Sequence, residues 1–212
     1  MKLLRSSALA GLAALGAVVG GLADGVANAS AGGLDPSFGT GGVVITSANY
    51  NGSAPPSDVM PQPDGKILVI AQLTDPATDG DFGVLRYQAS GAADTSFGTS
   101  GQATAAFTNF INTPYDAALQ PDGKIVVVGD AESADGTLNE FAVARFNANG
   151  ILDSGFGTGG KVTTNFVGVH SGGESNPAYV VLVQPDGKII VGGSASTAAK
   201  TQISGNRQAE LA

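Results

Sequence analysis

The sequence predicts an all-β protein of about three β-propeller-like blades, each with four antiparallel strands, forming an incomplete, open propeller. Three observations predict this class: a tight-turn motif that occurs three times, a second motif that recurs every 59 residues, and runs of β-branched residues after each turn. The composition agrees, because only 13% of the residues are charged and 32 of 212 are glycine. Such a composition does not favour long helices.

The first 31 residues are predicted to direct export. Lys2 and Arg5 precede an apolar run at 8–19 that is too short and glycine-rich for a membrane span. Small residues at 27–31 then provide two cleavage sites, so we expect a cleavable signal peptide over 1–29, cut after Ala29 or Ala31. A retained N-terminal anchor helix is the alternative. The expected location is secreted, periplasmic or cell envelope.

After residue 31 no stretch is long and apolar enough to span a membrane. The chain also contains no cysteine, which excludes disulfides and a bacterial-type lipid anchor. We therefore expect packing alone to stabilise the exported protein.

The segment Gln-Pro-Asp-Gly-Lys stands at 62–66, 120–124 and 184–188. Proline presets φ for the first corner of a turn, aspartate accepts a hydrogen bond from the backbone two residues on, and glycine adopts the positive φ that closes the bend. An apolar run follows each copy, which predicts strand, turn, strand. The expected turn residues are Asp64, Gly65, Asp122, Gly123, Asp186 and Gly187.

A second motif, Leu/Ala-Asp-x-Ser/Gly-Phe-Gly-Thr, recurs out of phase with the turn and divides residues 32–196 into repeats at about 34–92, 93–151 and 152–196. Extra residues in the third repeat predict a surface loop at 169–177. A third motif, Phe-x-Val-x-Arg, occurs at 82–86 and 141–145. Its third copy is absent, and the tail at 197–212 carries no strand signal.

One repeat is expected to form a meander of four strands. In the middle repeat these are 102–107, 115–120, 124–128 and 140–146. The third strand is apolar on both faces, which predicts a sheet covered on both sides by neighbouring sheets. A β-sandwich is the structural alternative, although its strands would have one solvated face and no long-period repeat.

The three motifs together resemble those of the delta-60 repeat proteins, which are exported bacterial repeat proteins. The resemblance covers residues 34–196 and implies a β-propeller fold. It implies no activity and no cofactor. The chain departs from the family pattern in its small number of repeats and in the missing last copy of Phe-x-Val-x-Arg.

Two kinds of repeated residue are predicted to hold the blades together. Phe38, Phe97 and Phe156 stand at one position of the repeat and are expected to be packing anchors. Arg86 and Arg145 each lie one glycine turn before an aspartate, Asp94 or Asp153. We expect a structural ion pair or backbone contact in each repeat, with a ligand site as the alternative.

Sites for chemistry are few in this sequence. The acidic loop at 75–81 offers weak calcium candidates, Asp75, Asp79 and Asp81, without the spacing of a known calcium loop. The single histidine, His170, has no second histidine or cysteine to complete a zinc site or nucleophilic relay. Glu132, Glu140 and Glu174 are scattered singly. We expect no metal, no cofactor and no enzyme activity.

The expected function is therefore that of an exported binding or structural module whose partner is an unknown protein or glycan. With 10 Lys and Arg against 18 Asp and Glu, nucleic acid is not an expected partner. The alternative is a fragment of a larger propeller enzyme, a hydrolase or lyase, whose active-site loops lie elsewhere.

The number of repeats leaves three arrangements open, since propellers close with roughly four to eight blades. The chain is a fragment of a longer protein, or copies associate to complete a ring, or it remains an open arc. The unfinished last blade favours the first hypothesis. An unfinished blade also exposes a strand edge through which copies can associate.

Overall fold

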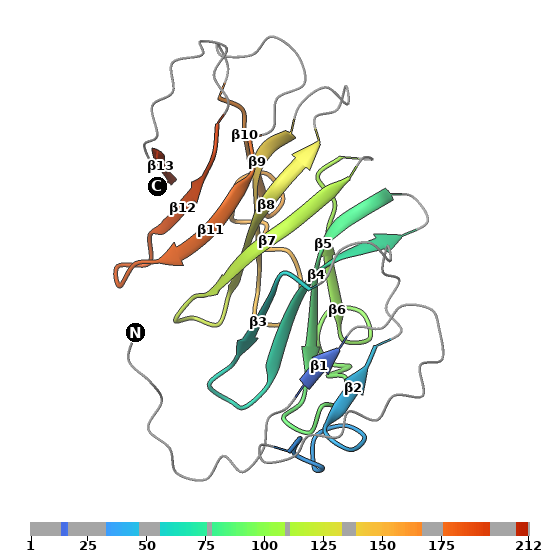
Figure 1. Ribbon diagram of the computed structural model, residues 1–212. Coiled ribbons are helices and arrows are strands. Elements are labelled where there is room, and N and C mark those ends of the chain that lie inside the picture. The colour runs from blue at the N-terminus through green and yellow to red at the C-terminus, as the bar shows by residue number, and fades with distance from the viewer. Residues whose placement is uncertain are drawn as a thin grey trace.

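The computed structural model of the protein describes residues 14–16, 33–46, 56–75, 78–108, 111–132, 139–166, 176–195 and 207–211. Every regular element in these ranges is a β-strand, and the strands form two four-stranded sheets, one three-stranded sheet and one pair. The three larger sheets follow one another like an open fan (Figure 1). This arrangement confirms the predicted all-β, open propeller-like fold.

The two complete blades have the same topology. Blade 1 contains β3 (Asp58–Pro61), β4 (Ile67–Asp75), β5 (Thr78–Tyr87) and β6 (Gln102–Ala105), hydrogen-bonded in that order. Blade 2 repeats the order with β7 (Asn112–Leu119), β8 (Ile125–Glu132), β9 (Asn139–Phe146) and β10 (Lys161–Thr164). All pairs in both blades are antiparallel.

The expected grouping of strands into sheets is wrong by one strand. The strand that begins at Gln102 was expected to open the blade of β7 to β9, but it pairs with β5 and closes the preceding blade. The reason is that the Phe-Gly-Thr motif forms a turn that reverses the chain, so that β6 runs back along β5. Each complete blade therefore starts before a Gln-Pro-Asp-Gly-Lys turn and ends after a Phe-Gly-Thr turn.

Blade 3 contains β11 (Ala178–Val183), β12 (Ile189–Gly193) and β13 (Arg207–Leu211). The tail was expected to lack strands, yet β13 lies in it and pairs antiparallel with β12. By register, Glu210 occupies the position of Arg86 and Arg145. Backbone pairing thus outweighs the loss of the Phe-x-Val-x-Arg pattern.

A short pair of strands lies at the other end of the fan. β1 (Ala14–Gly16) runs parallel to β2 (Val43–Ile45). The residues of β1 fall inside the expected signal peptide. Among the described residues no helix is long and apolar enough to cross a membrane.

The three Gln-Pro-Asp-Gly-Lys segments form the expected turns. In each, the glutamine N–H donates to the lysine carbonyl across 2.7 to 2.8 Å, and the aspartate Oδ1 accepts from the lysine N–H at 3.1 to 3.2 Å. Gly65, Gly123 and Gly187 have φ between 83° and 86°. This left-handed conformation favours glycine.

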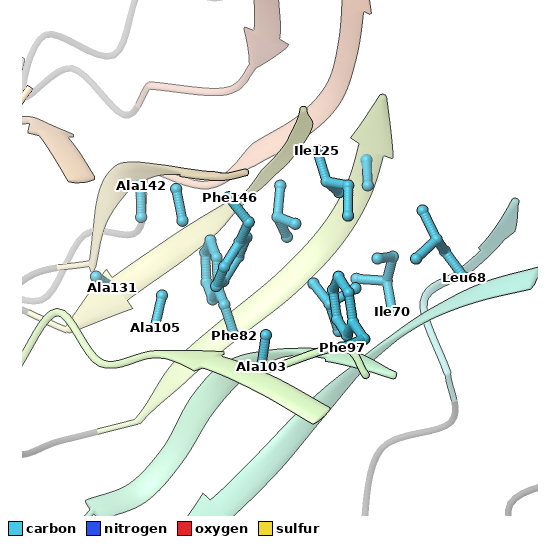
Figure 2. Packing of buried hydrophobic residues seen from close by; sticks show 14 residues of the cluster. Leu68, Ile70, Phe82, Phe97, Ala103, Ala105, Ile125, Ala131, Ala142 and Phe146 are labelled. Atoms are coloured by element: carbon cyan, nitrogen blue, oxygen red, sulfur yellow. The ribbon is translucent and has the colours of Figure 1, made fainter. Parts of the chain in front are cut away.

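The core lies between the sheets. The largest cluster fills the space between blades 1 and 2, where side chains of both sheets interdigitate (Figure 2). Alternate residues of β8 face opposite ways: Ile125 and Val127 pack against blade 1, whereas Val126 and Val128 pack against blade 3. β8, which is the second strand of blade 2, is thus covered on both faces, as its apolar residues predict.

A glycine on the second strand leaves room for a phenylalanine of the preceding blade. A Cβ on Gly129 would lie 2.8 Å from the Phe82 ring and 2.0 Å from the Thr113 carbonyl oxygen. A Cβ on Gly193 would meet Phe141 in the same way, at 2.4 Å. In blade 1 the corresponding residue is Ala71. We call this glycine position the notch.

Candidate functional site

Each complete blade carries a cluster of an arginine, an aspartate, a lysine and a phenylalanine at its Phe-Gly-Thr turn. In blade 1, Arg86 Nε lies 2.7 Å from Asp94 Oδ2, and Lys66 Nζ lies 3.5 Å from the same oxygen. The Arg86 guanidinium also covers the Phe97 ring at 4.4 Å. The ion pair expected from the sequence is present.

Blade 2 repeats this cluster. Arg145 Nε lies 2.9 Å from Asp153 Oδ2, Lys124 Nζ lies 3.6 Å from it, and the guanidinium covers Phe156 at 4.5 Å. We name these groups the Arg–Asp–Lys clusters of blades 1 and 2.

The Arg–Asp–Lys cluster of blade 1 binds the next blade. Arg86 Nη1 donates to the Ala148 carbonyl at 2.6 Å, and the Gly98 N–H donates to the Asn149 carbonyl at 2.8 Å. The Ser96 hydroxyl, together with the Ser96 N–H and Arg86, lowers the pKa of Asp94 to about 2. A carboxylate held this firmly in its ionised form acts as a structural anchor at neutral pH.

Aspartates on the first strands form a second link between blades. The Asp116 carboxylate accepts the Val181 N–H of blade 3 at 2.7 Å. Asp58 stands at the same position of blade 1 and accepts the N–H groups of Val59 and Ala117, while burial raises its pKa. The corresponding residue of blade 3 is Val180, so the row of carboxylates ends there.

The junction of blades 2 and 3 holds side chains that the other repeats do not share. Tyr115 and Tyr179 stand at β-bulges of β7 and β11, and their ring centroids lie 5.3 Å apart. The Tyr115 hydroxyl donates to the Asp130 carboxylate. Burial raises the pKa of both groups, and the charge of Asp130 raises that of Tyr115 further.

In blade 1 the equivalent positions are held by Ser57 and Gln72, which make different contacts. Gln72 Nε2 donates to the Asn112 carbonyl at 3.1 Å, and Ser57 Oγ donates to the Pro114 carbonyl at 2.6 Å. Blade 1 therefore uses these positions for neutral bonds to its successor. Blade 2 replaces them with a tyrosine and a buried carboxylate, and Tyr179 is half exposed.

Several predicted candidates lie apart from this junction. Asp81 is buried in β5, and the side chains of Asp75 and Asp79 are outside the described part, as are His170 and Glu174. Glu132 and Glu140 lie on β8 and β9. Within the described ranges no three His, Cys, Asp or Glu side chains are grouped closely enough to hold a metal ion.

A cavity of about 280 Å³ lies between β2 and blade 1. Val44, Tyr87 and Gln102 are among its lining residues, and the Tyr87 hydroxyl shares a hydrogen bond with the Thr46 hydroxyl. Its walls carry one charged side chain, Arg86, which is already bound to Asp94. The cavity is therefore a gap beside a short strand, and its one charged group is already engaged.

The comparisons with known proteins agree with this geometry. A family model described as "Domain of unknown function (DUF5122) beta-propeller" matches residues 62–97, 120–156 and 184–207. The chain is a β-propeller repeat protein. Each match to this propeller family begins at a Gln-Pro-Asp-Gly-Lys turn. No curated protein matches the chain significantly.

Reasoning from the sequence missed the junction residues Tyr115, Tyr179 and Asp130. The repeats share the residues that hold the blades together, such as Arg86 and Arg145, and these three are not among them. The signal available was a position that the repeats share only in part: blade 1 has Ser57 where blades 2 and 3 have Tyr115 and Tyr179. Binding residues lie mostly on loops and strand ends that a rigid scaffold positions, and they are argued from the site and not from the fold.

Proposed function

We propose that this propeller protein is an exported, non-catalytic binding module of the delta-60 repeat type, with its ligand face at the junction of blades 2 and 3. The observation that carries the proposal is the pair of Tyr115 and Tyr179, which present aromatic rings at two adjacent bulges. Tyrosine is enriched at binding surfaces because it offers apolar area and a polar hydroxyl together.

The state of the charged groups supports binding over catalysis. Asp94 and Asp153 are committed to arginine and lysine, and Asp116 caps a backbone N–H. Asp130 is buried and bonded to Tyr115. These carboxylates hold the fold and the tyrosine pair. Export is supported by the leader-like pattern of residues 1–31.

The test is a binding screen with protein isolated after export, against a glycan array and against envelope proteins. We expect binding to one of the two classes, and Tyr179→Ala should weaken it at least tenfold, as expected for loss of an exposed aromatic contact. Ile151→Ala is the matched control, because Ile151 is an exposed apolar residue outside the junction. Equal binding by the two variants would overturn the assignment of the ligand face.

A mass measurement on the same exported protein tests the expected leader. Loss of residues 1–29 or 1–31 is the expected result. A protein that keeps these residues would contradict export by a cleavable signal, whatever the binding screen finds.

A further inference from the structure

The segment 34–46 has the structure of the end of a blade. Its Thr40 bridges Val43 as Thr99 bridges Gln102 and Thr158 bridges Lys161. The Gly39 N–H donates to the Ser90 carbonyl at 2.7 Å, as the Gly98 N–H donates to Asn149. Val44 packs against blade 1 as Ala103 packs against blade 2. β2 is therefore a fourth strand, seated in front of blade 1.

This fourth strand has an unusual neighbour. β6 and β10 each pair antiparallel with the third strand of their own blade, whereas β2 pairs in parallel with β1. Blade 3 has the reverse deficiency. Its order is β11-β12-β13, so within the described residues its third strand is an edge with no fourth strand beside it.

Charges at the two ends are complementary in the same way. In blades 1 and 2 the turn lysine bonds both the aspartate of its own turn and the aspartate of the Phe-Gly-Thr motif. Lys188 of blade 3 bonds Asp186, and its side chain is 53% exposed. Asp35, which is the aspartate of the first motif, bonds the nearby Ser37. Among the described residues neither one has the second partner that its equivalents have.

We propose that a second copy of this chain completes blade 3 by donating its segment 34–46, so that β2 of one copy pairs antiparallel with β13 of the other. The pairing of β5 with β6 sets the register: Val43 lies opposite Ala209, Val44 opposite Gln208, and Ile45 opposite Arg207. Lys188 then bonds Asp35 of the second copy. By register Glu210 stands where the complete blades have arginine, so Lys188 is the cation that this composite cluster brings to Asp35.

Within one chain the two ends do not meet. β2 and β13 lie at opposite ends of the fan (Figure 1). Two copies joined at both ends provide four complete and two composite blades, and a ring of about six blades lies within the roughly four to eight that propellers use. Removal of the leader, on which the proposed function also depends, takes β1 away and frees the edge of β2.

The face of blade 3 that points away from blade 2 fits this role. Val180 and Leu182 of β11 are 58% and 52% exposed, whereas Val181 packs toward blade 2. In a ring this face lies against blade 1 of the second copy. Val180 stands where blades 1 and 2 have Asp58 and Asp116, so blade 3 has no carboxylate to accept a backbone N–H of the second copy. The N–H at that place, of Val59, already donates to Asp58 of its own blade at 2.7 Å. The notch position differs as well, since blade 1 has Ala71 where blades 2 and 3 have glycine.

Cysteine cross-linking tests the register, because the exported chain has no cysteine of its own. Exported Val43→Cys protein is mixed with exported Ala209→Cys protein in a glutathione redox buffer. We expect a disulfide-linked pair, since opposed residues of antiparallel strands have Cβ atoms about 4.5–5.5 Å apart. The matched control mixes Val43→Cys with Gln208→Cys, because a one-residue slip places the thiols on opposite faces. Equal linkage in both mixtures, or none in the first, would overturn the pairing.

Light scattering tests the assembly independently. Exported wild type should have the mass of two copies, and Leu182→Asp should be a folded single copy, because a carboxylate on that face would be buried without a partner. Lys188→Asp should weaken the dimer at least tenfold, and an added Asp35→Lys change should restore it. A wild type that remains a single copy at every concentration would contradict the inference while leaving the proposed binding function to its own screen.

Discussion

The junction of blades 1 and 2 and the junction of blades 2 and 3 contain the same motif residues in different surroundings. Phe97 and Arg86 at the first junction are fully enclosed, and the Arg86 side chain is 8% exposed. Phe156 and Arg145 at the second are partly exposed, the arginine at 19%. The local partners are alike, so the difference comes from the following blade.

Arg145 differs from Arg86 in having no turn of the following blade to bond within the described residues. Arg86 reaches the Ala148 carbonyl in the turn after β9, and no counterpart of that turn lies in the described part of blade 3. A repeat motif thus fixes the contacts inside its own blade, while its burial depends on the completeness of the next one. Four predictions test the comparison of the two junctions, from the largest effect to the smallest.

Phe97→Ala should cost about 3–5 kcal/mol of unfolding free energy, as expected when a fully buried aromatic ring is removed. Phe156→Ala should cost roughly half of that, because its ring is partly solvated before the change. Urea denaturation followed by circular dichroism gives both values. Equal costs would mean that the completeness of the next blade does not matter to the anchor.

Arg86→Ala should lower the unfolding free energy by about 2–3 kcal/mol, because the buried Asp94 then keeps Lys66 as its one cation. Arg145→Ala should cost about 1 kcal/mol, since its pair with Asp153 is more exposed. The same denaturation measurement applies. Arg86→Lys is the control that keeps the charge and removes the guanidinium contacts, and it should fall between wild type and Arg86→Ala.

The pKa of Asp94, lowered to about 2, gives a pH test. Because its folded pKa lies below the unfolded value of 3.8, its contribution is fully present above about pH 4 and is lost as the pH falls toward 2. The stability difference between wild type and Asp94→Asn should therefore shrink over this range in thermal melts. Asp153→Asn should show a smaller change, because Gly155 provides no hydroxyl in place of Ser96. A difference that stays constant down to pH 2 would contradict the assignment.

Asp130→Asn should stabilise the protein at neutral pH by about 1 kcal/mol, since an amide avoids the cost of a buried carboxylate. Burial raises the pKa of Asp130, so wild type loses stability as the pH rises through the range above 3.8, and the variant does not. Melting curves between pH 4 and 8 measure this trend. A destabilised variant would indicate that the charge of Asp130 stabilises the junction, and would count against the cost inferred from its burial.

The turn chemistry and the β-branched runs were sufficient to predict the hairpins and the stacking of sheets, though not which strands each sheet contains. Pro-Asp-Gly fixes a tight turn from local dihedral preferences, and residues such as Val127 and Val128 need cover on both faces of β8. The ion pairs of Arg86 and Arg145 also follow from spacing, because a glycine turn brings the following aspartate back beside the arginine.

The grouping of strands and the tyrosine pair could not be predicted in the same way. Whether the strand from Gln102 pairs backward with β5 or forward with β7 depends on the path of the Phe-Gly-Thr turn, in which Gly98 adopts a φ of 52°. A Cβ there would lie 2.0 Å from the Gln102 carbonyl oxygen. β13 depends on backbone pairing alone. Tyr115 and Tyr179 meet only because two bulges in different sheets lie side by side.

The notch of the second strand also constrains how such an array grows by gene duplication. Blade 2 has Gly129, which leaves room for Phe82 of blade 1, and Phe141, which packs against Gly193 of blade 3. A duplicated blade 2 would therefore fit directly behind its parent. A duplicated blade 1 would set the Ala71 methyl group against the Phe82 ring, so lengthening of the array is expected to proceed from its middle.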